Sequence, residues 1–237
     1  MSDRSTTTSK SFSDSLIEFL GNHRKALLVI SGVIVVGIVA AVAVAQIANV
    51  RSDRAVRAAE HIQSLWSDYQ DAAGATDQAD QAASLEEELR TAITDAKDQY
   101  PRTYGARRAQ FVLGQLEWSL ENWQAAQDAF MAVVNDHRTT HLTAPAMFSA
   151  AAAAENLGEL DRARELYGRL AEGTIQPNVE VAHALFNLGR LAEEDGDTQL
   201  ALEYYNRLVD EHGDSNWTNL GRNRIIWLTS QGAGAEG

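Results

Sequence analysis

Two histidines have the type and spacing that come nearest to a metal site in this 237-residue sequence. His137 and His141 are four positions apart, a spacing that on one face of a helix can ligate a metal ion. They lie across a predicted turn, however, and no carboxylate stands at a supporting spacing. The sequence motifs of serine hydrolases, zinc proteases, P-loops and dinucleotide-binding folds do not occur. We therefore expect no metal, no cofactor and no enzymatic activity.

The composition excludes further classes of function. The chain has 33 acidic and 20 basic residues, a net charge of −13. This balance argues against nucleic acid as a partner, because phosphate binding needs clustered Lys and Arg. The chain has no cysteine, which excludes disulfides, thiolate-bound zinc, iron–sulfur clusters and thiol nucleophiles.

One long segment, Ala26 to Ala48, contains no charged residue. As a helix it would be about 34 Å long, enough to cross a hydrocarbon core of about 30 Å. A cleaved signal peptide is disfavoured because its apolar region is only about 7–15 residues long. A buried core helix is disfavoured because charge-free runs of this length are rare in so small a domain. We expect a retained transmembrane helix over residues 26–48.

The charges beside this segment are nearly balanced, with Arg24 and Lys25 before it and three arginines soon after it. The positive-inside rule therefore decides little. A short tail, residues 1–25, followed by a large body of net charge −14 is typical of a signal anchor. We expect a single-pass protein of a bacterial inner membrane, with its N-terminus in the cytoplasm and its body in the periplasm. Phe12, Leu16 and Phe19 recur at helical spacing, either as an interfacial helix or as an extension of the span.

Helical periodicity dominates beyond residue 48. Residues 49–106 are expected to form a linker helix and an N-terminal capping helix pair, connected through the low-complexity stretch 72–84. That pair should end at Tyr100, because the residue before Pro101 is pushed out of helical geometry. Residues 107–231 should hold three repeats and a C-terminal capping helix over 216–231, and residues 232–237 a flexible tail.

Three segments, which start at Arg107, Ala144 and Ala182, repeat one pattern. Position 8 is small, position 20 is alanine and position 24 is aromatic: Gly114, Ala151 and Gly189; Ala126, Ala163 and Ala201; Phe130, Tyr167 and Tyr205. Small residues let paired helices approach closely, and we expect the ring at position 24 to fill the gap between neighbouring repeats. Since one helix pair cannot bury its apolar face alone, we expect a contiguous, capped stack.

This spacing resembles the tetratricopeptide repeat, a helix–turn–helix module of 34 residues. The resemblance covers residues 107–215 and implies an all-α fold, in which the transmembrane helix is followed by an α-solenoid of helix pairs. There are three departures. The repeats recur every 37 and 38 residues, the closing proline is absent, and the fourth-position tryptophan is replaced by Gln110, Met147 and Leu185.

The resemblance also implies a groove that binds protein segments on the concave face of the first helices. In this register the candidate partner-binding residues are Phe111, Gln115 and Trp118 in the first repeat, Phe148 in the second, and His183, Phe186 and Arg190 in the third. The phenylalanine at position 5 of each repeat can instead pack between adjacent first helices. The spacing leaves both roles open.

The overall layout resembles the ancillary subunit family of the SecYEG translocon in bacterial inner membranes. The matching residues are Asn22 to Lys25 before the span and Asp98 to Ala106 before the repeats. The resemblance implies a chaperone-like periplasmic role beside the translocon, with emerging or unfolded secreted proteins as partners. The alternative is a structural scaffold in envelope assembly or cell division, in which self-association or one fixed complex matters more than a groove.

Overall fold

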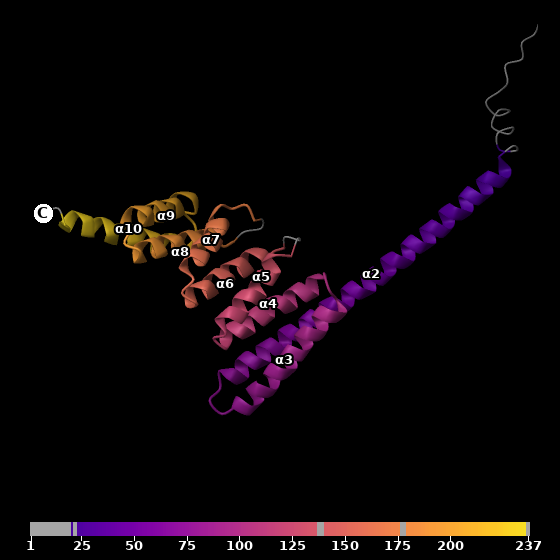
Figure 1. The fold of residues 1–237 in the computed structure, drawn as a ribbon, viewed down its shortest axis with the longest axis horizontal. Coiled ribbons are helices and arrows are strands. Elements are labelled where there is room, and N and C mark those ends of the chain that lie inside the picture. Colours follow the sequence, from indigo (N-terminus) through magenta and orange to yellow (C-terminus); the bar gives the residue numbers. More distant parts are fainter. Residues whose placement is uncertain (1–19, 21–22, 137–139, 176–178, 236–237) are drawn as a thin grey trace, which may run out of the picture. The chain divides into compact units, whose positions relative to one another are not determined.

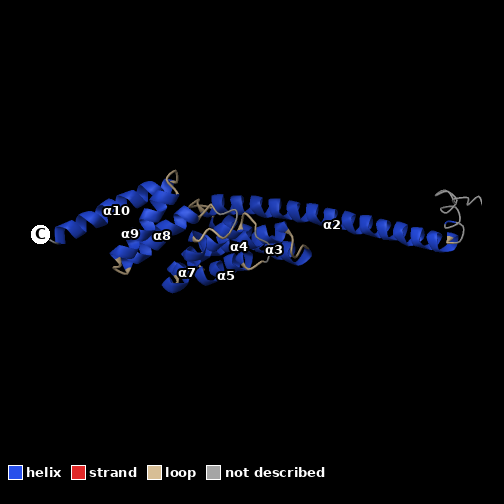
Figure 2. Cartoon of the chain, turned by 90° about the horizontal axis from the view of Figure 1, so that it is seen from above, coloured by secondary structure: helices blue, strands red, loops and turns tan. Residues whose placement is uncertain are grey.

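The computed structural model describes residue 20 and residues 23–136, 140–175 and 179–235 of the chain, and all regular structure within them is helical (Figures 1 and 2). The predicted all-α fold is therefore confirmed for this part of the chain. Phe12, Leu16 and Phe19, which were predicted to lie on a helix, fall outside it. The chain divides into two compact units, residues 1–53 and residues 54–237.

Helix α2 (Arg24–Ala73) contains the predicted membrane segment and continues into the second unit without a break. From Leu28 onward it is long and apolar enough to cross a membrane. Its apolar side chains in the first unit, such as Ile34 and Val42, are exposed. The predicted span and linker helix form one continuous helix because no proline interrupts residues 24–73.

The second unit begins with a capping helix pair, the second half of α2 and α3 (Ala79–Gln99). Ile62, Trp66 and Tyr69 of α2 share a buried cluster with residues of α3 and of α4 (Tyr104–Ser119). At Gly105, an added Cβ would lie 2.2 Å from the Ala55 carbonyl oxygen, so only glycine allows α4 to approach α2 this closely. The pair therefore closes one end of the core. As predicted, α3 ends immediately before Tyr100.

Three helix pairs follow, each made of two short helices joined by a tight turn (Figure 1). They are α4 with α5 (Trp123–Val134), α6 (Thr143–Asn156) with α7 (Leu160–Ala171), and α8 (Val181–Glu194) with α9 (Thr198–Glu211). Each helix packs against the helices next to it in the chain. Most of the fully buried positions between them are alanine or leucine, which form one cluster across the three pairs.

The aromatic residue at position 24 lies against position 8 of its own repeat. A Cβ added at Gly114 would lie 2.6 Å from the Phe130 ring, and one added at Gly189 would lie 2.5 Å from the Tyr205 ring. The small residue therefore makes room for the ring within one helix pair. As expected, Tyr205 also contributes to the packing against the next element, because it shares a buried cluster with Leu228. The sequence showed the spacing of the two positions but not that they touch.

The turn inside each pair has a residue in the left-handed backbone conformation, always at the same position of the repeat. Gly158 and Gly196 have φ angles of +76° and +78°, and Glu121 takes this position in the first repeat with φ +57°. Each turn closes with backbone hydrogen bonds to the end of the preceding helix, the usual way of satisfying C-terminal carbonyls. A left-handed conformation costs a non-glycine residue about 1 to 2 kcal/mol, so the first turn is strained where the other two are not.

Helix α10 (Asn216–Ala235) packs against α8 and α9 at the other end of the array. Leu228 is buried with Ala192, Ala201 and Tyr205. The helix extends past residue 231, where the predicted capping helix was expected to end. Leu220, Ile226 and Trp227 remain exposed on it.

Candidate protein-binding site

A groove of about 350 Å³ runs across the first helices of the array. Its lining comes from four helices: Trp66 and Gln70 of α2; Gln115, Trp118 and Ser119 of α4; Phe130 of α5; and Phe148, Ser149 and Ala152 of α6. The spacing of three to four residues along each helix places these side chains on one face. The groove is large enough to hold part of a ligand, since binding pockets begin at about 300 Å³.

Three predicted binding residues, Gln115, Trp118 and Phe148, meet in this groove. Trp118 packs edge-on against Trp123, with ring centroids 5.0 Å apart. Phe111 is half-buried and packs edge-on against Phe130, with centroids 5.4 Å apart. Phe111 therefore supports a wall of the groove from behind.

The predicted residues of the third repeat lie in an aromatic stack further along the first helices. The imidazole of His183 stands between two rings, 3.9 Å from the centroid of Phe148 and 3.7 Å from that of Trp217. Phe186 packs against Trp217 and Tyr205. Phe148 and Phe186 are both half-buried, so each packs between helices and still presents part of its ring on this face.

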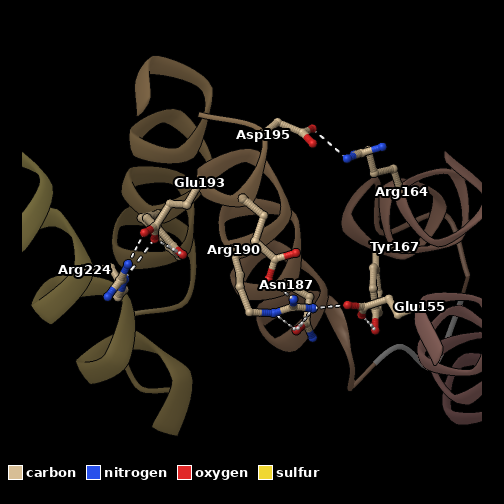
Figure 3. A network of polar contacts seen from close by, with 10 residues as sticks. Glu155, Arg164, Tyr167, Asn187, Arg190, Glu193, Asp195 and Arg224 are labelled. Atoms are coloured by element: carbon tan, nitrogen blue, oxygen red, sulfur yellow. Dashed lines mark hydrogen bonds and ion pairs between the residues drawn. The ribbon is translucent and has the colours of Figure 1, made fainter. Parts of the chain in front are cut away.

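Arg190, the last predicted residue, belongs to a polar network that joins two repeats (Figure 3). Its guanidinium donates to Glu155 of α6 and, at 2.7 Å, to Glu194 of its own helix. Glu155 also accepts a 2.7 Å hydrogen bond from the hydroxyl of Tyr167. Arg190 is thus held by carboxylates of this chain.

The same arrangement recurs one repeat later (Figure 3). Tyr205 donates a 2.6 Å hydrogen bond to Glu193, which also accepts from Arg224 of α10. In both networks the tyrosine at position 24 donates to the glutamate at position 12, which also accepts from an arginine two helices further along the chain. The first repeat has Trp118 and Phe130 at these two positions, and there the groove opens instead.

Burial and hydrogen bonding shift the pKa values of these groups. Burial raises the pKa of Tyr167 and Tyr205 well above that of a free tyrosine, and the glutamate each one donates to raises it further. Burial alone would raise the pKa of Glu193, but hydrogen bonds from Arg224 and Tyr205 outweigh it and lower that pKa. These shifts belong to structural contacts between helices, and none of the three shifted groups is among the residues that line the groove.

No cluster of three or more metal-binding side chains occurs among the described residues. His137, one of the two histidines considered for a metal site, lies outside them. The imidazole of His141 is hydrogen-bonded to the hydroxyl of Tyr104 at 2.9 Å.

Sequence reasoning missed the residues that complete the site from outside the repeats. Trp66 and Gln70 come from the capping pair, and Trp217 comes from the closing helix. Trp66 has the same helical spacing as leucines of the core, so its position in the sequence does not show whether it lies in the core or in the groove. Trp217, Leu220 and Gly221 have the spacing of the tryptophan, leucine and glycine at the start of a tetratricopeptide repeat, and this spacing is a hint that the closing helix continues the array.

Two comparisons with known proteins bear on this array. Residues 183–215, which include most of α8 and all of α9, match the tetratricopeptide repeat family. A TPR repeat-containing protein of Treponema pallidum (strain Nichols) is 30% identical over 128 residues. The aligned region is 54% of this chain and 53% of that protein, so the chain spans about half the length of the curated relative it matches. Both findings support the tetratricopeptide character of the helix pairs.

Proposed function

We propose that this chain is a membrane-anchored repeat protein that captures segments of other proteins on the concave face of its array. The groove formed by Trp66, Gln115, Trp118 and Phe148 is the observation that carries the proposal. It combines exposed parts of aromatic rings with neutral polar groups, the composition that favours protein anchors. The match to tetratricopeptide repeats supports it, because such arrays present concave binding surfaces.

The anchor in this proposal is the apolar first part of α2, which is exposed and long enough to span a bilayer. We place the repeats at the extracytoplasmic face of the bacterial inner membrane. There the chain would act as a chaperone-like ancillary factor of the Sec translocon and hold emerging or unfolded secreted proteins. The layout of a short tail, one apolar helix and an acidic repeat array supports this placement.

Site-specific photocrosslinking in intact cells tests the proposal. A benzophenone amino acid replaces Gln115 in the groove of the full chain, and the matched control carries it at Glu203, which is exposed on α9. We expect adducts with translocon subunits and with many different secreted proteins from Gln115, and few from Glu203. Equal adducts from both positions would contradict a binding role for the groove.

A second candidate function is a structural scaffold in envelope assembly or division. The exposed apolar residues of α10, Leu220, Ile226 and Trp227, favour it, because exposed apolar patches mark association surfaces. The crosslinker placed at Ile226 distinguishes the two functions. Adducts with a few fixed envelope proteins or with a second copy, combined with none at Gln115, would favour the scaffold.

A further inference from the structure

We infer that the groove binds an apolar side chain from a polypeptide segment that carries basic residues on either side of it. This inference rests on the proposed function and names the chemistry of the partner. It follows from three observations: the uncharged lining of the groove, the acidic helix pair beside it, and the arginines of the capping pair and first helices, which already have acceptors.

The groove lining is free of charge. All the residues that form it are aromatic, alanine, serine or glutamine. At position 12 the second and third repeats carry Glu155 and Glu193, whereas the first carries Trp118. An apolar side chain buried here gains about 25 cal/mol for each Å² removed from water, while a charged one would be desolvated without an opposite charge. The groove therefore selects an uncharged, apolar anchor.

The helices beside the groove are strongly acidic. Residues 60–99, the end of α2 and all of α3, contain ten acidic and two basic residues, a net charge of −8. Most of these acids, including Asp68, Asp71, Glu87 and Asp95, are exposed. Asp71 follows Gln70, which lines the groove. Complementary charges accelerate association and suppress partners of like charge, so the flanks of a bound segment should be basic.

Three described arginines of the capping pair and of the first helices already donate to groups of this chain, so they are not free to receive an acidic segment. Arg90 donates to Glu86 and Glu117, and Arg190 donates to Glu155 and Glu194. Arg108 donates to Gln63 and Tyr104. Recruiting any of them would break contacts that now hold the helices together.

Binding of three labelled peptides to the full chain in zwitterionic nanodiscs tests the inference. The peptides share a Leu-Phe-Leu centre and carry two lysines, two glutamates or two serines on each side. Fluorescence anisotropy gives the Kd at low and at physiological salt. We expect the lysine peptide to bind at least 10-fold more tightly than the glutamate peptide, with a difference that shrinks as salt rises. Equal affinities, or tighter binding of the glutamate peptide, would overturn the inference.

Two variants locate the interaction. Trp118→Glu places in the first repeat the residue that the other repeats carry at this position, and we expect it to weaken the lysine peptide at least 10-fold. Asp68→Asn with Asp71→Asn should weaken it about 3-fold and reduce the salt dependence. The matched control Glu203→Gln with Asp210→Asn removes the same charge from exposed positions of α9 and should change nothing.

The outcomes separate this inference from the proposed function. Circular dichroism confirms that each variant keeps its helices. If crosslinking at Gln115 captures partners but the lysine peptide shows no preference, the groove binds protein without charge selection and the inference fails alone. If Trp118→Glu abolishes neither crosslinking nor peptide binding, the groove is not the site and both fail.

Discussion

At the scale of single residues, the contact between positions 8 and 24 determines how closely each helix pair packs. Gly189 leaves room for the ring of Tyr205, whose hydroxyl is fixed by Glu193. The ring therefore cannot move aside for a larger residue without breaking a charge-assisted hydrogen bond. Gly168, by contrast, has no atom within 4 Å of an added Cβ and lies in the middle of α7.

Gly189→Ala should lower the free energy of unfolding by about 1 to 3 kcal/mol, the usual effect of overpacking a core. Gly168→Ala is the matched control and should raise it by about 0.5 to 1 kcal/mol, because alanine loses less backbone entropy than glycine in a helix. Urea unfolding followed by circular dichroism measures both. A neutral Gly189→Ala would show that the two helices can separate slightly without loss.

The lowered pKa of Glu193 predicts a loss of stability in acid. The folded protein holds this carboxylate ionised at a pH where the unfolded chain, with a pKa of about 4.3, already takes up a proton. The contribution of the Glu193 carboxylate to stability is therefore present above that pH and is lost as the pH falls through the folded-state pKa. Glu193→Gln should cost about 1 to 2 kcal/mol at pH 7 and flatten the pH dependence between pH 5 and 3. The exposed Glu203→Gln should leave that dependence unchanged, and an identical slope in Glu193→Gln would contradict the assignment.

At the scale of helices, the array is held by apolar packing between neighbours and by polar contacts that recur from repeat to repeat. The contact between Arg190 and Glu155 joins α8 to α6 across a repeat boundary. The ion pair of Arg207 with Glu211 lies within α9, and Arg207 also donates to the Ala171 carbonyl oxygen of α7, a contact that the double-mutant cycle on the ion pair cancels. The two ion pairs therefore allow the coupling energy between two helices to be compared with the coupling energy within one helix.

A double-mutant cycle on Glu155→Gln and Arg190→Gln should give a coupling energy of up to about 1 kcal/mol, limited because the arginine side chain is 35% exposed. The cycle on Glu211→Gln and Arg207→Gln should give about 0.3 to 0.5 kcal/mol, as is usual for surface pairs in one helix. Chemical denaturation of the wild type, the four single variants and the two double variants provides the data. A coupling across the repeats no larger than that within α9 would contradict a role in holding repeats together.

Sequence periodicity predicted the helical fold and the repeat register well, because position 8, position 20 and position 24 carry local steric signals. The candidate site was predicted less completely. Gln115, Trp118 and Phe148 belong to the repeats and were found from their register, whereas Trp66 comes from a helix about 50 residues earlier in the chain. Nothing in local spacing encodes which distant helix completes a groove. Arg190 was expected to face a partner, but its partners are carboxylates of its own chain.

At the scale of the whole molecule, charge is distributed unevenly along the chain. The apolar part of α2 has no charge between residues 26 and 48, and the residues after it carry a net charge of −14. An acidic body is repelled by anionic lipid surfaces. This distribution suits a domain that is tethered to a bilayer but remains in water.

The proposed orientation can be tested directly because the chain has no cysteine. A single cysteine introduced as Gly237→Cys should react with a membrane-impermeant maleimide in intact spheroplasts, and Ser2→Cys should react only after lysis. Gel-shift detection of the labelled chain measures both. Labelling of Ser2→Cys before lysis, with none of Gly237→Cys, would reverse the proposed topology.

The packing of each helix against its neighbours in the chain also has a kinetic consequence. Folding slows as contacting residues become more distant in sequence, and here most helix contacts join elements separated by a single turn. Each pair can therefore add to the pairs already formed before it once its second helix is synthesised, with no need to wait for the C-terminus. The array should fold in milliseconds or faster and expose its alanine-rich surfaces to aggregation only briefly.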